Sequence, residues 1–179
     1  MKAIVPALPW LAIFAIGIGA VASVPQQGDA ARSDDLAVRV QRIEDRAAIE
    51  RLLLDYGRDL DRGDFAAYSR LFAAEGEWSG SIGTFRGPAA IQAAMEKTFA
   101  PKPGVAAPKP RSFHLLTNAM IDIDGDRATA VSKWTFVRVA DNKPVIANAG
   151  EYEDVLVREN GRWRFAKRVA PSVLTPAPG

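Results

Sequence analysis

The sequence lacks cysteine altogether and contains a single histidine, His114. The absence of cysteine excludes disulfides, thiolate nucleophiles and cysteine-ligated metal sites. Histidine is the side chain that ordinarily changes charge near neutral pH, so any acid–base chemistry in that range points first to His114. A lone histidine between Phe113 and Leu115 also fits simple packing in a strand. The rest of the chain has to decide between these two interpretations.

The chain also lacks a strong excess of charge of either sign. Among its 179 residues, 23 are Lys or Arg and 21 are Asp or Glu, which leaves a formal net charge of +2. Such a balance produces no global field for nucleic acid or acidic lipid, and the sequence has no glycine-rich phosphate loop or nucleotide fingerprint. The hydrophobic fraction of 48% suffices for one globular core. Length and composition therefore predict one domain with extensions and no nucleic-acid partner.

The first 22 residues have the composition of a signal peptide. Lys2 supplies a short positive start, an apolar and uncharged stretch follows, and Ala20–Ala22 fits the small-residue cleavage pattern. The stretch approaches the length that spans a membrane, so an uncleaved N-terminal anchor is the alternative. Pro6 and Pro9 shorten the helix that could form there and favour cleavage. We therefore expect an exported protein, periplasmic or secreted, whose mature form makes no membrane contact.

Helical periodicity begins after a polar linker predicted at residues 23–33. One long helix, or two in tandem, is expected over residues 34–62, with Gly63 ending it. The apolar positions recur at helical spacing: Leu36, Val40, Ile43, Ala47, Ile49, Leu53, Tyr56 and Leu60. Asp64 is a suitable cap for a second helix, and Gly87-Pro88 opens a third.

The second half of the chain alternates with the period of a strand. The predicted strands cover residues 113–123, 127–139, 145–158 and 163–169. Asp124-Gly125 and Asn160-Gly161 mark turns between them. An earlier extended segment is expected at residues 75–85, a proline-containing loop at residues 100–110, and a flexible tail at residues 171–179. This order predicts an α+β fold, in which a curved antiparallel sheet of about four to six strands wraps around long N-terminal helices and leaves a cavity between them.

Several separate stretches agree in order and spacing with one known family. They are residues 49–72 (IERLLLDYGRDLDRGDFAAYSRLF), 85–91 (FRGPAAI), 114–118 (HLLTN), 121–128 (IDIDGDRA), 150–154 (GEYED) and 161–165 (GRWRF). Together they resemble the SnoaL-like branch of the NTF2-like superfamily. The resemblance implies an NTF2-like cone, with a SnoaL-like domain over residues 34–170. It does not identify a substrate, because this fold hosts many chemistries and non-catalytic members.

The resemblance also implies a site. Scytalone dehydratase, bile-acid dehydratase and hexachlorocyclohexane dehydrochlorinase carry an Asp–His pair in the cone, and Asp61 and His114 match its two positions. Bile-acid dehydratase has a tyrosine five residues before the aspartate, which Tyr56 matches, whereas the dehydrochlorinase has a lysine there. The sequence departs from bile-acid dehydratase at residues 127–139, which contain no Asp or Glu to supply that enzyme's second pocket carboxylate.

Asp61 and His114 are a minimum set for β-elimination or a proton shift, and Tyr56 is a candidate electrophilic aid. A neutral imidazole can act as a base, a carboxylate can orient it and stabilise the imidazolium, and a phenol can donate to a developing oxyanion. Such chemistry needs neither a cofactor nor a metal, and we expect none. The candidate substrate-binding residues are Trp78, Asn118, Trp134 and Phe136.

Two hypotheses follow from the sequence. In the first, the chain is an exported, cofactor-independent lyase of the dehydratase type, or an isomerase, that acts on a hydrophobic, cyclic small molecule. In the second, the same fold is a non-catalytic module that binds a small ligand or dimerises. The resemblance also makes a homodimer an assembly to test.

Overall fold

The computed structural model describes residues 27–100 and 112–174 and divides the chain into two compact units, residues 1–36 and 37–179. In the first unit the described part is the start of helix α1 (Gln27–Arg62), which continues into the second unit. The predicted signal peptide and the proline-containing loop lie outside the described residues, apart from Ala100 at the start of that loop. No helix within the described ranges is long and apolar enough to cross a membrane.

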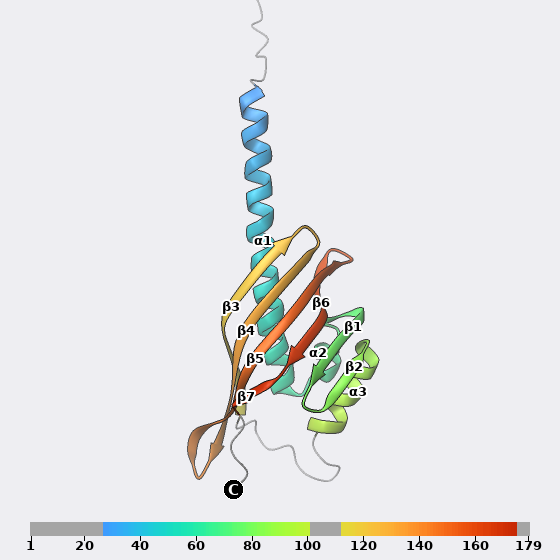
Figure 1. Ribbon diagram of the computed structural model, residues 1–179, viewed down its shortest axis with the longest axis vertical. Helices are drawn as coiled ribbons and strands as arrows, with labels where there is room; N and C mark the ends of the chain where they lie inside the picture. Colours follow the sequence, from blue (N-terminus) through green and yellow to red (C-terminus); the bar gives the residue numbers. More distant parts are fainter. Residues whose placement is uncertain (1–26, 101–111, 175–179) are drawn as a thin grey trace, which may run out of the picture. The chain divides into compact units, whose positions relative to one another are not determined.

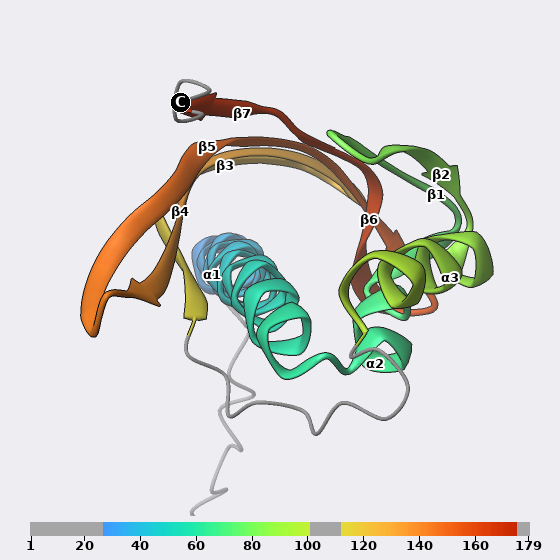
Figure 2. The same ribbon diagram turned by 90° about the horizontal axis from the view of Figure 1, so that it is seen from below.

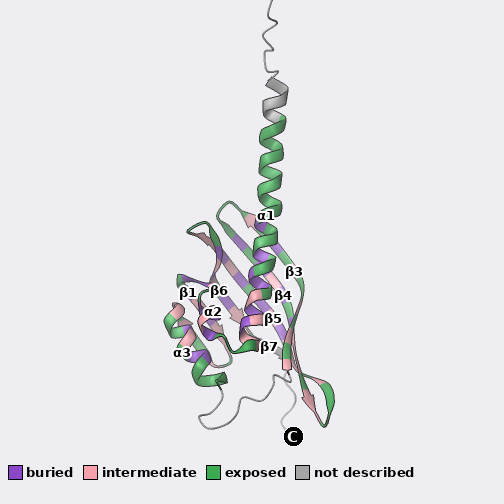
Figure 3. Cartoon of the chain, turned by 180° about the vertical axis from the view of Figure 1, so that it is seen from behind, coloured by how far each residue is buried: buried purple, intermediate pink, exposed green. Residues whose placement is uncertain are grey.

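Helix α1 is a single helix, and it begins earlier than the sequence predicted. Residues 27–33, expected to be linker, are helical, because extending an existing helix costs little once it has nucleated. The apolar repeat is buried only in its second half, where Ile49, Leu53 and Tyr56 are buried, whereas Val40 and Ile43 are exposed. Figure 3 shows this change along the helix.

Two short helices follow. Asp64 caps α2 (Phe65–Ser69) as predicted, since its side chain accepts a hydrogen bond from the backbone N–H of Ala67. α2 is short, because strand pairing already begins at Phe72. Helix α3 (Pro88–Phe99) begins at the predicted proline, and Gly87 before it has a φ of 78°, a backbone conformation that glycine adopts without strain.

The strands form one curved sheet. Their bounds are β1 (Phe72–Gly80), β2 (Gly83–Arg86), β3 (Ser112–Asp124), β4 (Arg127–Ala140), β5 (Lys143–Glu159), β6 (Arg162–Ala170) and β7 (Ser172–Leu174). The strand order is β2-β1-β6-β5-β4-β3, and β7 pairs with β5. Figure 1 shows the long strands side by side, and Figure 2 shows the sheet curving around the second half of α1. The predicted α+β class, with a sheet wrapped around a long helix, is confirmed.

Two details of the sheet differ from the prediction. Strand β1 pairs with β6 in parallel, so the sheet is mixed rather than wholly antiparallel. Residues 172–174, predicted to belong to a flexible tail, form β7, whereas residues 175–179 lie outside the described part of the chain. Both differences concern strand pairing between residues far apart in sequence, which local periodicity does not report.

Candidate functional site

Asp61 and His114 are in direct contact. Asp61 lies in the last turn of α1 and His114 on β3. The Asp61 Oδ1 atom lies 2.6 Å from His114 Nδ1, and the backbone N–H of His114 donates to Asp61 Oδ2 at 2.9 Å. Both side chains are largely buried, with exposed fractions of 20% and 16%. Because both carboxylate oxygens bind the same residue, the imidazole is fixed in position and orientation.

The pair leaves one ring nitrogen free. With Nδ1 donating to the carboxylate, Nε2 carries a lone pair, and it has no hydrogen-bond partner among the described residues. The ring of Phe136 lies against the imidazole, with 4.7 Å between ring centroids. An oriented imidazole with an available lone pair is the arrangement of a general base.

Gly57 allows strand β3 to approach helix α1 at this point. A Cβ atom at Gly57 would lie 2.9 Å from Leu116 Cδ1 and 3.9 Å from His114 Cβ. Gly57 stands one turn before Asp61 on the same side of α1. The absence of a side chain there leaves room for the Leu116 side chain against α1, next to the Asp61–His114 contact.

The pair borders a cavity of about 700 Å³, which we call the site cavity. This volume lies in the range of ligand pockets in proteins. Apolar and aromatic side chains form most of its wall: Tyr56, Leu60, Phe65, Tyr68, Trp78, Ile82, Met95, Phe99, Trp134, Phe136 and Tyr152. Among the described residues that line it, Asp61 is the only carboxylic acid and Arg62 the only Lys or Arg. The site cavity is therefore suited to an apolar ligand with few polar groups.

Three tyrosines form one side of the site cavity. The Tyr56 hydroxyl accepts a hydrogen bond from Trp78 Nε1 at 3.0 Å, so its own proton remains available for donation. The rings of Tyr68 and Tyr152 lie 4.7 and 5.3 Å from that of Tyr56. Burial, followed by the proximity of Tyr56, raises the pKa of Tyr68 and Tyr152 well above the ordinary value. These two phenols therefore stay protonated over the physiological range.

A buried ion pair, Arg168–Asp154, lies against the rings of Tyr56 and Tyr152. Arg168 donates to both carboxylate oxygens of Asp154, at 2.7 and 2.6 Å, and both side chains are fully buried. Burial alone would lower the pKa of Arg168, but the charge and hydrogen bonds of Asp154 raise it above the ordinary value. The guanidinium lies 4.0 Å from the ring centre of Tyr56 and 4.2 Å from that of Tyr152. Arg168 therefore fixes the position of both rings.

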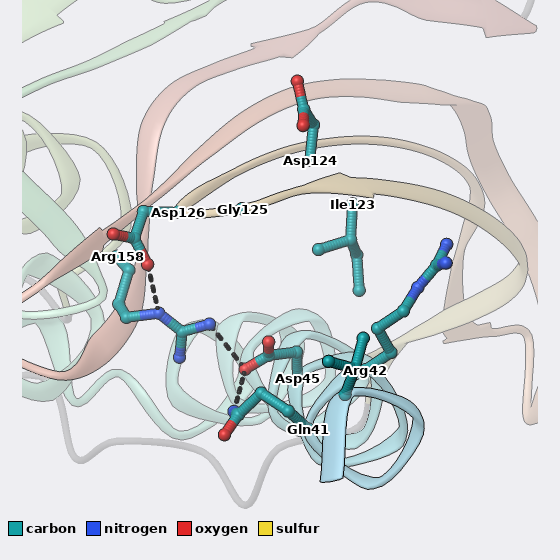
Figure 4. Close-up of a pocket in the computed structure, with 9 residues that line it drawn as sticks. Gln41, Arg42, Asp45, Ile123, Asp124, Gly125, Asp126 and Arg158 are labelled. Atoms are coloured by element: carbon teal, nitrogen blue, oxygen red, sulfur yellow. Dashed lines mark hydrogen bonds and ion pairs between the residues drawn. The ribbon is translucent and has the colours of Figure 1, made fainter. Parts of the chain in front are cut away.

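A second cavity, also of about 700 Å³, lies between α1 and the β3–β4 turn, and we call it the polar pocket. Figure 4 shows Arg158 between Asp45 and Asp126, with contacts of 2.7 Å to each. Asp45 also accepts hydrogen bonds from Gln41 and Trp163, both at 3.1 Å. Burial would raise the pKa of Asp45, but these donors, Arg158 first among them, lower it below the ordinary value. All three donors bind the Oδ1 atom of Asp45, so protein groups hold this carboxylate in place.

Most of the predicted site residues line the site cavity. Tyr56, Asp61 and His114 do so, together with the predicted substrate-binding residues Trp78, Trp134 and Phe136. Asn118 does not. It is exposed and has a φ of 54° at an irregularity in the β3–β4 pairing between Thr117 and Met120. The extra residue at this bulge turns Asn118 away from the interior face.

The sequence did not point to several residues of the cavity wall. Tyr68, Tyr152 and Asn148 line the site cavity, but each looked like an ordinary helix or strand position in the sequence. Their only sequence signal was a position on the inward-facing side of a helix or strand. Ordinary core residues occupy the same kind of position, so this signal does not identify a site. Within residues 27–100 and 112–174 no group of three or more His, Asp or Glu side chains is arranged to hold a metal ion.

Residues 41–169, more than two thirds of the chain, match the SnoaL-like domain. The chain belongs to the SnoaL-like family. No curated protein sequence matches this SnoaL-like protein.

Solved structures share the fold of this SnoaL-like domain. An NTF2-like protein with a cystatin-like fold from Novosphingobium aromaticivorans is 26% identical, over 80% of this chain and 92% of that one, with a TM-score of 0.68. A protein of unknown function from Mycobacterium tuberculosis is 26% identical, over 75% of each chain, with a TM-score of 0.63. A scytalone-dehydratase-like protein from N. aromaticivorans is 23% identical, over 74% of this chain and 87% of that one, with a TM-score of 0.60, and this likeness shows the fold alone.

Proposed function

We propose that this SnoaL-like protein is a cofactor-independent lyase of the dehydratase type, or an isomerase, that acts on a hydrophobic, cyclic small molecule. The observation that carries the proposal is the contact between Asp61 and His114 beside an apolar cavity of ligand size. Solved structures of the same fold include a scytalone-dehydratase-like protein, which is consistent with this class of reaction. Among the described residues that line the site cavity, Asp61 is the only carboxylic acid. The site therefore differs from an active site that uses two carboxylic acids.

In the dehydratase reaction, His114 is the base. Its Nε2 takes a proton from the carbon next to a ring carbonyl, and the electron pair of that C–H bond enters the developing enolate. A C=C bond then forms as the C–O bond at the β carbon breaks, and the departing hydroxide takes the proton from Nε2 as water. Asp61 stabilises the imidazolium between these steps. In an isomerase reaction, Nε2 of His114 instead returns the proton to a different carbon of the substrate.

Tyr56 has the role of an electrophile in this scheme. Its hydroxyl accepts a hydrogen bond from Trp78, which leaves its proton to donate to the carbonyl oxygen as negative charge develops there. Neutral Tyr68 and Tyr152 surround it, and Arg168 lies against its ring. A cationic neighbour and protonated phenols favour an oxyanion at this position over a neutral or cationic group.

The test is a dehydration assay with a panel of cyclic β-hydroxyketones. Product formation is followed by the near-ultraviolet absorbance of the conjugated enone, and proton abstraction without elimination by deuterium exchange in D₂O. We expect His114→Ala to reduce kcat by about 10²–10⁴-fold, the usual contribution of a general base, while calorimetric binding of the product ketone stays nearly unchanged. Unchanged turnover in this variant, or neither dehydration nor exchange with any compound, would favour the non-catalytic binding module.

Export of the protein is a separate proposal. It rests on Lys2, the apolar stretch that follows and the cleavage pattern at Ala20–Ala22. Expression in a bacterial host should yield a periplasmic protein whose mass corresponds to cleavage after Ala22. A full-length protein in the membrane fraction would support the uncleaved anchor instead.

The homodimer also remains a proposal. Phe113, Leu115 and Met120 alternate along β3 with side chains that are 47%, 47% and 65% exposed, and a second copy could cover this apolar row. Sedimentation velocity at micromolar concentration distinguishes a dimer from a monomer. If the protein is a dimer, Leu115→Glu should shift it toward the monomer.

A further inference from the structure

Arg62 lies in the wall of the site cavity and has no ion-pair partner within residues 27–100 and 112–174. It is the last residue of α1, it is exposed, and it lines the cavity beside Asp61. No hydrogen bond or ion pair joins it to any described residue. The exposed members of the lining are Arg62, Gly63, Ser81, Phe99 and Ala100, so the site cavity opens to solvent between these residues.

The acidic neighbours of Arg62 in sequence have other partners. Asp59 binds Arg58 at 2.7 Å, and Asp61 binds His114 through both oxygens. Asp64 accepts the backbone N–H of Ala67 as the cap of α2. A position at the end of a helix favours a cation only weakly, and this effect does not require the side chain to border a cavity.

Among the described residues of the wall, none besides Arg62 is a Lys or Arg and none besides Asp61 is an acid. Its interior members are apolar or aromatic, and its one carboxylate is directed to His114. Ser81 and Ser112 also line the site cavity and can donate hydrogen bonds. A planar guanidinium with five N–H donors binds a carboxylate through two parallel hydrogen bonds.

From this arrangement we infer that the ligand of the site cavity is an apolar ring compound with an anionic oxygen group, such as a carboxylate, which Arg62 binds at the opening. The ring system occupies the aromatic interior, where His114 and Tyr56 reach it. Arg62 is thus a specificity-determining residue rather than a catalytic one. The inference rests on the proposed function only in taking the site cavity as the ligand site.

The test uses two probes of nearly the same shape, 2-naphthoate and 2-naphthamide, which differ in charge. Isothermal titration calorimetry with the purified protein should give a dissociation constant about 10-fold lower for the carboxylate, the scale of a charge-assisted contact at a partly exposed position. Arg62→Gln should abolish this preference and leave the affinity for the amide unchanged. Arg62→Lys should retain part of it, and added salt should reduce it in the unmodified protein.

Lys97→Gln is the matched control. Lys97 is an exposed cation in the last turn of α3 that does not line the site cavity, so this variant loses the same charge elsewhere and should keep the preference. Equal affinities for the two probes, no measurable binding of naphthoate at millimolar concentration, or an unchanged preference in Arg62→Gln would each overturn the inference.

Failure of this inference is distinguishable from failure of the proposed chemistry. Equal binding of the two probes together with turnover that depends on His114 would remove the role of Arg62 and leave the base in place. Binding of naphthoate that depends on Arg62, in a protein that neither dehydrates nor exchanges any ketone of the panel, would retain the anion site and remove the catalytic proposal.

Discussion

The site cavity and the polar pocket have the same volume, about 700 Å³, and each holds one aspartate contributed by α1. Asp45 in the polar pocket accepts hydrogen bonds from three residues, Gln41, Arg158 and Trp163. Asp61 in the site cavity directs both oxygens to one residue, and that residue has a free ring nitrogen. A carboxylate held by three protein donors stabilises the fold, whereas an Asp–His pair whose imidazole keeps an unused nitrogen beside an apolar space can act on a ligand.

The strongest way to test this contrast is Asp61→Asn. The amide retains the size of the side chain but does not stabilise an imidazolium, so kcat should fall by about 10³–10⁴-fold, the scale known for the aspartate of a catalytic triad. The matched variant Asp45→Asn should leave kcat within about 2-fold, because surface and structural sites remote from the chemistry do not change the barrier. Steady-state kinetics with one substrate compares the two. Equal losses of kcat in both variants would remove the distinction between the cavities.

A second test concerns the buried ion pair of Arg168 and Asp154. Arg168→Met leaves Asp154 buried without its partner, and the free energy of unfolding should fall by about 3–5 kcal/mol. Urea unfolding at pH 7 measures this. The double variant Arg168→Met/Asp154→Leu removes both charges and should recover much of the loss. A loss below about 1 kcal/mol in the single variant would show that the pair is not needed to hold Tyr56 and Tyr152 in place.

A third test compares the two aspartates for stability instead of activity. Asp45→Asn removes the charged acceptor of a buried network, and the free energy of unfolding should fall by about 1–3 kcal/mol. Asp61→Asn should cost less than about 1 kcal/mol, because the Asp61–His114 contact lies at the wall of a cavity and both side chains are partly exposed. Chemical denaturation of both variants under one buffer condition checks the order. The reverse order would mean that the Asp61–His114 contact is the structural one.

The smallest expected effect is on the pH dependence of stability. The pKa of Asp45 is lower in the folded protein than in the unfolded chain, so its contribution is present above the unfolded value of about 4 and is lost as the pH falls through the folded value. Between about pH 2 and 5, Asp45→Asn should therefore show a shallower loss of stability than the unmodified protein. Thermal unfolding at several pH values measures the two slopes. Identical slopes would show that Asp45 does not gain its donors on folding.

Particular residues show what the sequence could and could not predict. The positions of Asp61 and His114 followed from a family resemblance. Asn118 followed the same alternation as its neighbours, but a bulge placed it outside the site cavity. Arg168 gave no signal, because a basic residue on a strand usually faces solvent. Its burial depends on Asp154, which lies on the neighbouring strand.

The sequence by itself determined the order of the elements, the cap of α2, the turn after β3 and the inward faces of the strands, because these depend on backbone preferences and periodicities within a few residues. Only the tertiary structure decided the parallel pairing of β1 with β6, the pairing of β7, the enclosure of Arg168 by tyrosines and the difference between Asp45 and Asp61. These features depend on which distant segments come together, and a carboxylate has the same chemistry in both cavities until its neighbours are fixed.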